Sequence, residues 1–317
     1  MNEVSAPAEL LSVADLLLLG EYDGKATDYT LPDYRLEEYG YNYRERLKWL
    51  MFAGYLRIAD ARDSLANLTV SALKEILRSH GYKISGAKNE LVKRILANIE
   101  PEKYAEQVPK FYAATERGRR ELEMRSAYIE NQKQPYRFLN TEIAAVEAEL
   151  LARGEYSAEK VFERLYSRDT FKHGAAGDYG LLRNVYYDKF HFLKRHNRFE
   201  EGVLALMTVI YLDLSGLSNG KVVEGYENLK WALETRAWSE LDKLRTALNL
   251  SDDELKAKFD KAVKNCVVEL PFTYFSAEIA KEIIIGRLYG QMNLLERYKR
   301  NRNKPRANNP NYLYYGD

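Results

Sequence analysis

The sequence predicts a mainly α-helical protein with more than one domain. At 317 residues, the chain is long enough for two or three hydrophobic cores of ordinary size. Apolar residues recur three and four positions apart along most of it, while the alternation typical of strands is scarce. Helix start signals agree with this pattern, because Ser157 has the features of an N-cap and Ser251 with Glu254 has the spacing of a capping box.

Composition excludes several classes of site and location. The 48 Lys and Arg residues nearly balance the 47 Asp and Glu residues, so a nucleic-acid-binding surface must be a local patch. Cys266 is the single cysteine, which excludes an internal disulfide and a multi-cysteine metal site and favours a reducing cytoplasm. The apolar run at 203–212 is about half the ~20 residues that cross a bilayer. We therefore expect a cytoplasmic protein without a membrane-spanning segment.

Two short strands are expected to flank residues 68–99. A helix that is broken at Gly54 leads into a strand at 55–58. A second strand is expected at 111–114, before a helix whose N-cap is Thr115. We predict that the two strands pair with each other and that the intervening segment forms two helices of its own.

The intervening segment predicts two short amphipathic helices joined at a glycine-rich corner. Lys74 and Arg78 lie four positions apart on the polar side of the first helix. Gly81 can adopt the left-handed conformation that ends a helix, and Ile84 then adds a second apolar contact. The inner face of the first helix is expected to hold Val70, Leu73, Ile76 and Leu77.

The second helix is expected to begin directly after a turn at Ser85 and Gly86. Lys88, in its first turn, opposes the partial positive charge of a helix N-terminus, typically by ~0.3–1 kcal/mol. A bound phosphate would reverse that effect, because free backbone N–H groups and a flanking cation together form an anion site. The turn therefore predicts a phosphate cradle. The inner face of this helix is expected to hold Leu91, Val92, Ile95 and Ile99, with Lys93 and Arg94 outside it.

The ordered spacing of these residues resembles the SAP motif, a two-helix DNA-binding module named after scaffold-attachment factors, acinus and PIAS proteins. The resemblance covers about thirty residues of this chain. One position departs from the family, because many SAP sequences have a basic residue directly after the glycine and Ala87 stands there. The residues that carry the resemblance are Leu68, Thr69, Val70, Leu73, Lys74, Gly81, Ser85, Gly86, Lys88, Leu91 and Arg94.

The SAP resemblance implies binding to double-stranded DNA, often A/T-rich, mainly through the DNA backbone. The corner and the start of the second helix would meet the phosphates. The alternative is a charged, solvated helical hairpin that contacts another protein. The candidate DNA-binding residues are Lys74, Arg78, Lys83, Ser85, Gly86, Lys88, Lys93 and Arg94.

The segments on either side of the hairpin resemble the end of a winged-helix domain. In that family a helix leads into a Gly-Tyr-Leu strand, a wing, and a strand that closes in a Tyr-x-x-Thr-x-x-Gly-Arg pattern. Arg44, Arg46 and Lys48 in the preceding helix then become candidate groove or phosphate contacts. The alternative is a two-stranded clasp that only anchors the insertion. The closing pattern falls on Tyr112, Thr115, Gly118 and Arg119.

These features divide the chain into expected domains, with Pro135 as the best candidate boundary. The tail is basic and poor in aliphatic residues, so we expect it to be mobile, to attract DNA non-specifically and to contribute little stability. From Arg297 onward the six basic residues are Arg297, Lys299, Arg300, Arg302, Lys304 and Arg306, the last five of them within 299–317. The expected domains are a winged-helix-like α+β domain at 1–66 and 101–130, the inserted SAP hairpin at 67–100, a helical domain of unknown role at 131–298, and the mobile basic tail at 299–317.

No residue cluster predicts catalysis, a cofactor or a metal ion. The glycine-rich run around Gly177 lacks the Lys-Ser/Thr ending of a P-loop, so we interpret it as a loop between helices. His191 and His196 are five positions apart, which does not place two imidazoles on one helix face. Residues 202–217 instead predict a central buried helix, with Trp231 and Trp238, one heptad apart, packed nearby. We predict a protein that is not an enzyme.

The leading hypothesis is a cytoplasmic, non-enzymatic DNA-binding protein of prokaryotic or phage-like type, in which the hairpin grips duplex DNA. The C-terminal region would form a homo-oligomer or recruit a protein partner. The alternative is a protein-interaction scaffold whose hairpin does not bind DNA, which Ala87 and the nearly neutral overall charge favour. A continuous positive patch on the hairpin would support DNA binding, whereas interruption by Glu75 or Glu90 would support the scaffold.

Overall fold

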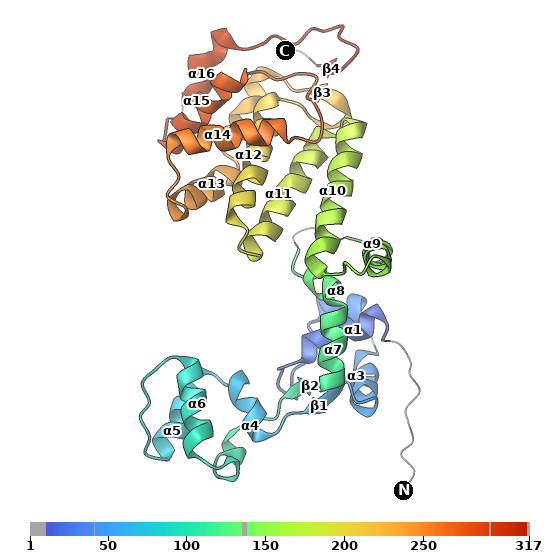
Figure 1. The fold of residues 1–317 in the computed structure, drawn as a ribbon, viewed down its shortest axis with the longest axis vertical. Helices are drawn as coiled ribbons and strands as arrows, with labels where there is room; N and C mark the ends of the chain where they lie inside the picture. The colour runs from blue at the N-terminus through green and yellow to red at the C-terminus, as the bar shows by residue number, and fades with distance from the viewer. Residues whose placement is uncertain (1–10, 41, 135–137, 292, 316–317) are drawn as a thin grey trace. The chain divides into compact units, whose positions relative to one another are not determined.

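The computed structural model describes residues 11–40, 42–134, 138–291 and 293–315 (Figure 1). It confirms the mainly α-helical class, since strands within these ranges are confined to two short pairs. None of the helices in the described ranges has both the length and the apolar character needed to cross a membrane.

The chain divides into two compact units, Met1–Gln132 and Lys133–Asp317. The boundary predicted at Pro135 itself lies outside the described residues. The elements of the first unit are α1 (Val13–Tyr22), α2 (Leu36–Tyr39), α3 (Tyr43–Phe52), β1 (Leu56–Ile58), α4 (Ala61–Ser64), α5 (Val70–Ser79), α6 (Lys88–Asn98), β2 (Tyr112–Ala114), α7 (Glu116–Met124) and α8 (Ser126–Asn131), with short 3₁₀ turns between several of them. Helices α1, α3 and α7 pack on the two-stranded sheet.

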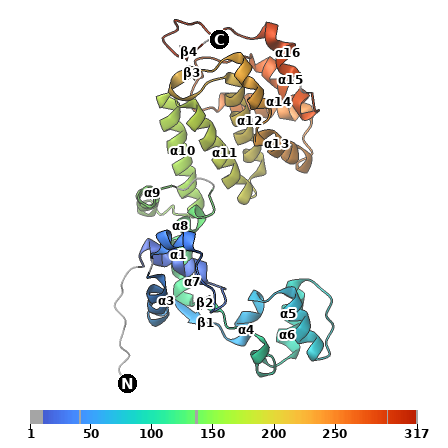
Figure 2. The same cartoon turned by 180° about the vertical axis from the view of Figure 1, so that it is seen from behind.

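The two strands of the first unit pair as the sequence predicts. They are antiparallel, with Leu56 opposite Ala114 and Ile58 opposite Tyr112. Helices α5 and α6 lie between them in the chain and pack against each other, as both views show (Figures 1 and 2). The prediction of two helices inserted between paired strands is therefore confirmed.

The Thr-x-x-Gly part of the closing pattern holds the sheet to α7. The Thr115 hydroxyl accepts the Gly118 N–H at 3.1 Å and donates to the Gly54 carbonyl oxygen at 2.6 Å. Gly118 has to be glycine, because a Cβ there would collide with the Tyr55 carbonyl oxygen. Arg119 donates to the Ala114 carbonyl oxygen at 2.9 Å. All of these contacts lie within the first unit and join the sheet to α7 at the base of the insertion.

The second unit is a helical bundle followed by a short parallel strand pair. Its elements are α9 (Asn140–Ala152), α10 (Ala158–Ala176), α11 (Tyr179–Arg195), α12 (Phe199–Ser215), β3 (Val222–Val223), the 3₁₀ helix η6 (Tyr226–Leu233), α13 (Arg236–Ala247), α14 (Asp252–Lys264), α15 (Ala277–Leu288), α16 (Leu294–Tyr298) and β4 (Leu313–Tyr314). The predicted central helix is α12, which is buried on most sides and packs against α11, α13 and α14.

The predicted helix starts of this unit are confirmed. Ser157 accepts the Lys160 N–H at 3.1 Å, and Ser251 and Glu254 form a reciprocal capping box. The loop in the glycine-rich run is shorter than expected. Gly177, with φ at 77°, ends α10, and α11 begins two residues later. The elements that carry the two tryptophans, η6 and α13, pack against α12 as expected, and Trp238 is buried whereas Trp231 is 51% exposed.

The expectation of a mobile tail at 299–317 is wrong for the part of the tail that the structure describes. Strand β4 pairs in parallel with β3, placing Leu313 beside Val222. Tyr312 is only 4% exposed, and its ring centroid lies 5.4 Å from that of Phe272. The Asn303 N–H donates to the Tyr274 carbonyl oxygen at 2.8 Å. The aromatic end of the tail thus supplies the apolar contacts that its basic part lacks.

Replacing Tyr312 with alanine tests the docked tail. The variant should lose about 3 kcal/mol of unfolding free energy, because a buried ring and the hydrogen bond that its hydroxyl accepts from the Arg306 N–H both disappear. Tyr315→Ala is the matched control, since that ring is 68% exposed and its loss should cost no more than about 0.5 kcal/mol. Chemical denaturation measures both, and equally small losses would show that the tail does not dock.

Candidate nucleic-acid interface

The hairpin has a hydrophobic core of its own. Thr69 caps α5 by accepting the Ala72 N–H at 3.2 Å, which fixes where the helix begins. One residue differs from the predicted inner face, because Val70 in the first turn is 40% exposed. The core residues, all buried, are Leu65, Leu68, Leu73, Ile76, Leu77, Leu91, Ile95, Ile99, Tyr104, Val108 and Phe111, together with Ala59. Phe111 lies directly before β2, so the core extends to the base of the insertion.

The corner between the helices is held by backbone contacts and one arginine. Gly81 has φ at 74° and ends α5, as predicted. Ile84 does not provide the expected apolar contact, because its side chain is exposed. Arg94 donates from one Nη1 atom to the carbonyl oxygens of Lys83 and Ser85, at 2.6 and 3.0 Å. Arg94 therefore holds the corner in place. The helix periodicity predicts only that Arg94 lies outside the inner face and does not predict this contact.

A carboxylate occupies the predicted phosphate cradle. Glu90 accepts the Ala87 N–H at 3.0 Å, and Ala87 has no side-chain oxygen with which to cap α6 itself. Gly86, with φ at 130°, allows this arrangement, because a Cβ there would collide with the Glu90 carboxylate. The predicted cradle around Gly86 and Lys88 is thus partly satisfied from within the chain. An acid three residues into a helix is a recognisable capping signal, which the sequence interpretation did not use here.

Four lysines on the hairpin have no ion-pair partner in the described part of the chain. Lys74 lies on α5, Lys83 in the corner, and Lys88 and Lys93 on α6. Lys83 and Lys93 are exposed, and the other two are half-buried. Burial of the stem leaves a lysine ammonium group free to reach solvent. Each of the three parts of the hairpin therefore contributes at least one available positive charge.

Arg78 differs from these lysines, because it pairs with Glu75 one turn before it. Both side chains are exposed, and exposed pairs contribute at most about 1 kcal/mol. A phosphate could therefore displace the Glu75 carboxylate from Arg78. The positive surface is not continuous, since Glu75 and Glu90 both interrupt it.

The basic residues of α3 divide into one that is paired within the first unit and two that are exposed. Arg46 donates from Nε and Nη2 to the buried carboxylate of Asp15, at 2.7 and 2.6 Å, and its guanidinium carbon lies 4.3 Å from the centre of the Trp49 ring. Its predicted role as a DNA contact is corrected to a structural one, because moving it would leave Asp15 buried and unpaired. Arg44 and Lys48 are exposed.

The geometry defines residues 64–100 as a small two-helix binding module with its own core and an outward set of cations. The family model of the SAP domain matches this segment, so it is a SAP domain. No curated protein matches the chain. The winged-helix resemblance of the flanking segments is not confirmed and stays a prediction.

Proposed function

We propose that this chain is a non-enzymatic DNA-binding protein that holds duplex DNA through phosphate contacts of its SAP domain. The SAP domain is a general DNA-binding motif. The observation that carries the proposal is the set of four lysines that pair with no acid among the residues that the structure describes, and they come from both helices and the corner of that domain. Lysine is a compact point charge that suits phosphate, whereas the planar fork of arginine suits bidentate recognition.

Binding of this kind is electrostatic and weakly selective. Phosphate contacts position a protein on DNA but carry no sequence information. With roughly three or four phosphates neutralised, the dissociation constant should lie near the micromolar range of non-specific binding. The formal net charge of +1 agrees with a local patch, because the remaining surface attracts DNA little. A preference for A/T-rich duplexes rests on the family resemblance alone.

Glu90 acts against phosphate binding at the start of α6. A phosphate that approached the Ala87 N–H would meet the Glu90 carboxylate that already accepts it. The lysines must therefore provide most of the attraction, while Ser85 and Gly86 contribute only after Glu90 rotates away. This competition accounts physically for a module that binds DNA but binds it weakly.

A second candidate function is a protein-interaction scaffold, which two observations favour. Glu75 and Glu90 interrupt the positive surface of the hairpin. The hairpin also exposes large apolar side chains that a protein partner could cover, and they are Val70, Tyr82, Ile84 and Leu96. The charge-reversal experiment below separates the two functions, because a scaffold does not lose DNA affinity when hairpin lysines change.

The C-terminal unit is proposed to contact a protein partner or a second copy of the chain. Exposed Leu139, Leu151 and Phe171 support this proposal, since large apolar side chains on a surface favour association. A cytoplasmic location is proposed from the lone cysteine, Cys266, which is free.

Charge reversal on the hairpin tests the proposed function. Lys74→Glu and Lys93→Glu should each weaken binding to a fluorescently labelled duplex by about tenfold near 0.1 M salt, because each removes one phosphate contact. Lys264→Glu on α14 makes the same change in net charge at an exposed lysine of the other unit. Its effect should be less than about twofold. Equal losses in all three variants would contradict binding by the hairpin.

Neutralising Glu90 should have the opposite effect. Glu90→Gln keeps an oxygen that can accept the Ala87 N–H, so the hairpin should stay folded. Removing one negative charge about 4 Å from a phosphate is worth about 1 kcal/mol in water, which corresponds to an affinity gain of about fivefold. Glu106→Gln, at an exposed acid beyond α6, is the control. Fluorescence anisotropy with the same duplex measures the affinity of both variants. An unchanged affinity in Glu90→Gln would show that the start of α6 does not contact DNA.

A further inference from the structure

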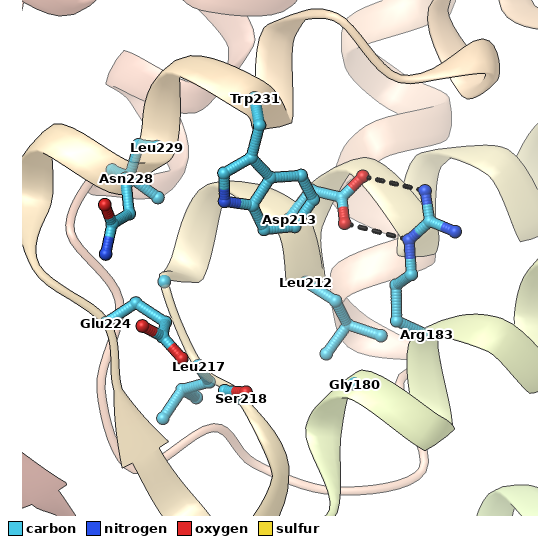
Figure 3. A pocket seen from close by; sticks show the side chains of 11 residues that line it. Gly180, Arg183, Leu212, Asp213, Leu217, Ser218, Glu224, Asn228, Leu229 and Trp231 are labelled. Atoms are coloured by element: carbon cyan, nitrogen blue, oxygen red, sulfur yellow. Dashed lines mark hydrogen bonds and ion pairs between the residues drawn. The ribbon is translucent and has the colours of Figure 1, made fainter.

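The second unit contains a cavity of about 320 Å³ that the proposed function does not use. It lies among α11, α12 and the segment that follows α12, and Figure 3 shows the side chains around it. Leu212, Leu217, Leu229 and the indole of Trp231 provide apolar walls. Pockets of roughly 300–1,000 Å³ with apolar walls and a few polar groups are typical small-molecule sites.

An ion pair in the cavity wall cancels its own charge. Arg183 donates from Nε and Nη2 to the two carboxylate oxygens of Asp213, at 2.9 and 3.2 Å (Figure 3). Burial raises the pKa of Asp213, which is only 3% exposed. The pair nevertheless remains ionised, because a neutral Asp213 would leave a permanently charged guanidinium half-buried without its counter-ion. Together the two side chains add no net charge to the cavity.

Glu224 provides a negative charge that no group in the described part of the chain neutralises. Its backbone is fixed on both sides, since its N–H donates to the Gly216 carbonyl oxygen at 2.8 Å and its own carbonyl oxygen accepts the Tyr274 hydroxyl at 2.7 Å. Its half-buried carboxylate has no hydrogen bond or ion pair in the described ranges. Figure 3 shows this side chain directed toward the cavity, across from Leu212.

Trp231 adds a second recognition element for a cation. Its indole lines the cavity and is 51% exposed, so its face is accessible to a ligand. The face of an indole attracts positive charge, and tryptophan does so more strongly than the other aromatic residues. Asn228 lines the same wall and offers an amide group for hydrogen bonding.

We propose that this cavity binds a small organic cation, with an amidinium, guanidinium or ammonium group on an apolar body. The net charge of the lining side chains is −1, which matches a monovalent cation. The leucines and the indole suit the apolar body, while Glu224 pairs with the charged group. An anion is disfavoured because Arg183 is already paired and Glu224 repels it. The proposal is independent of DNA binding, because the cavity and the SAP domain lie in different units.

Benzamidine and benzamide provide a matched pair of probes, since they have nearly the same shape and only benzamidine is positively charged. Isothermal titration of the full chain should show benzamidine binding at least tenfold more tightly than benzamide. Glu224→Gln should weaken benzamidine binding about tenfold, because it abolishes a charge-assisted hydrogen bond. Glu282→Gln, an exposed acid of α15 outside the cavity lining, should leave the affinity within twofold.

Tryptophan fluorescence locates the bound probe independently. Benzamidine should change the emission of the native chain, and Trp231→Leu should abolish that change while weakening binding about threefold. The remaining indoles of Trp49 and Trp238 then serve as internal controls. Equal affinities for the two probes, an equal loss in Glu282→Gln, or an emission change that persists without Trp231 would each overturn the proposal. Circular dichroism confirms that each variant is folded.

Discussion

The attachment of the SAP domain to the rest of the first unit depends on the close contact between Gly118 and the Tyr55 carbonyl oxygen. It brings the start of α7 against the strand pair, and Thr115 locks the same corner by bonding to Gly54. The chain leaves at β1 and returns at β2, so the two ends of the insertion are held side by side. With its ends fixed and a core of its own, the hairpin keeps its shape without contacts from its outer surface, and that surface is the one proposed to bind DNA.

That outer surface is a compromise between attraction and internal capping. The four hairpin lysines that have no ion-pair partner within the described ranges are the proposed phosphate contacts. Glu90 accepts a backbone N–H at the start of α6 that a phosphate would otherwise bind. Arg94 donates from Nη1 to the carbonyl oxygens of the corner, which holds its guanidinium group close to that corner. The same residues therefore determine both the shape of the module and its modest predicted affinity for DNA.

The local part of the structure could be predicted from the sequence, because caps, strand signals and helix periodicity depend on neighbouring residues. Thr115 and Ser251 begin helices as expected. The errors concern contacts between residues that are distant in sequence. Tyr312 packs against Phe272, and Arg46 pairs with Asp15. Neither contact can be predicted from the neighbouring residues in the sequence. The exposed side chains of Val70 and Ile84 and the cap that Glu90 provides at the start of α6 are local exceptions.

The salt dependence of DNA binding tests the central claim most directly. The account predicts that log K for a duplex falls with log salt concentration at a slope of about −3. The triple variant Lys74→Gln/Lys83→Gln/Lys93→Gln should reduce that slope to about −1, because Lys88 is then the one hairpin lysine left without an ion pair in the described part of the chain. A slope that the triple variant leaves unchanged would contradict the account, since the DNA would then be held by another surface.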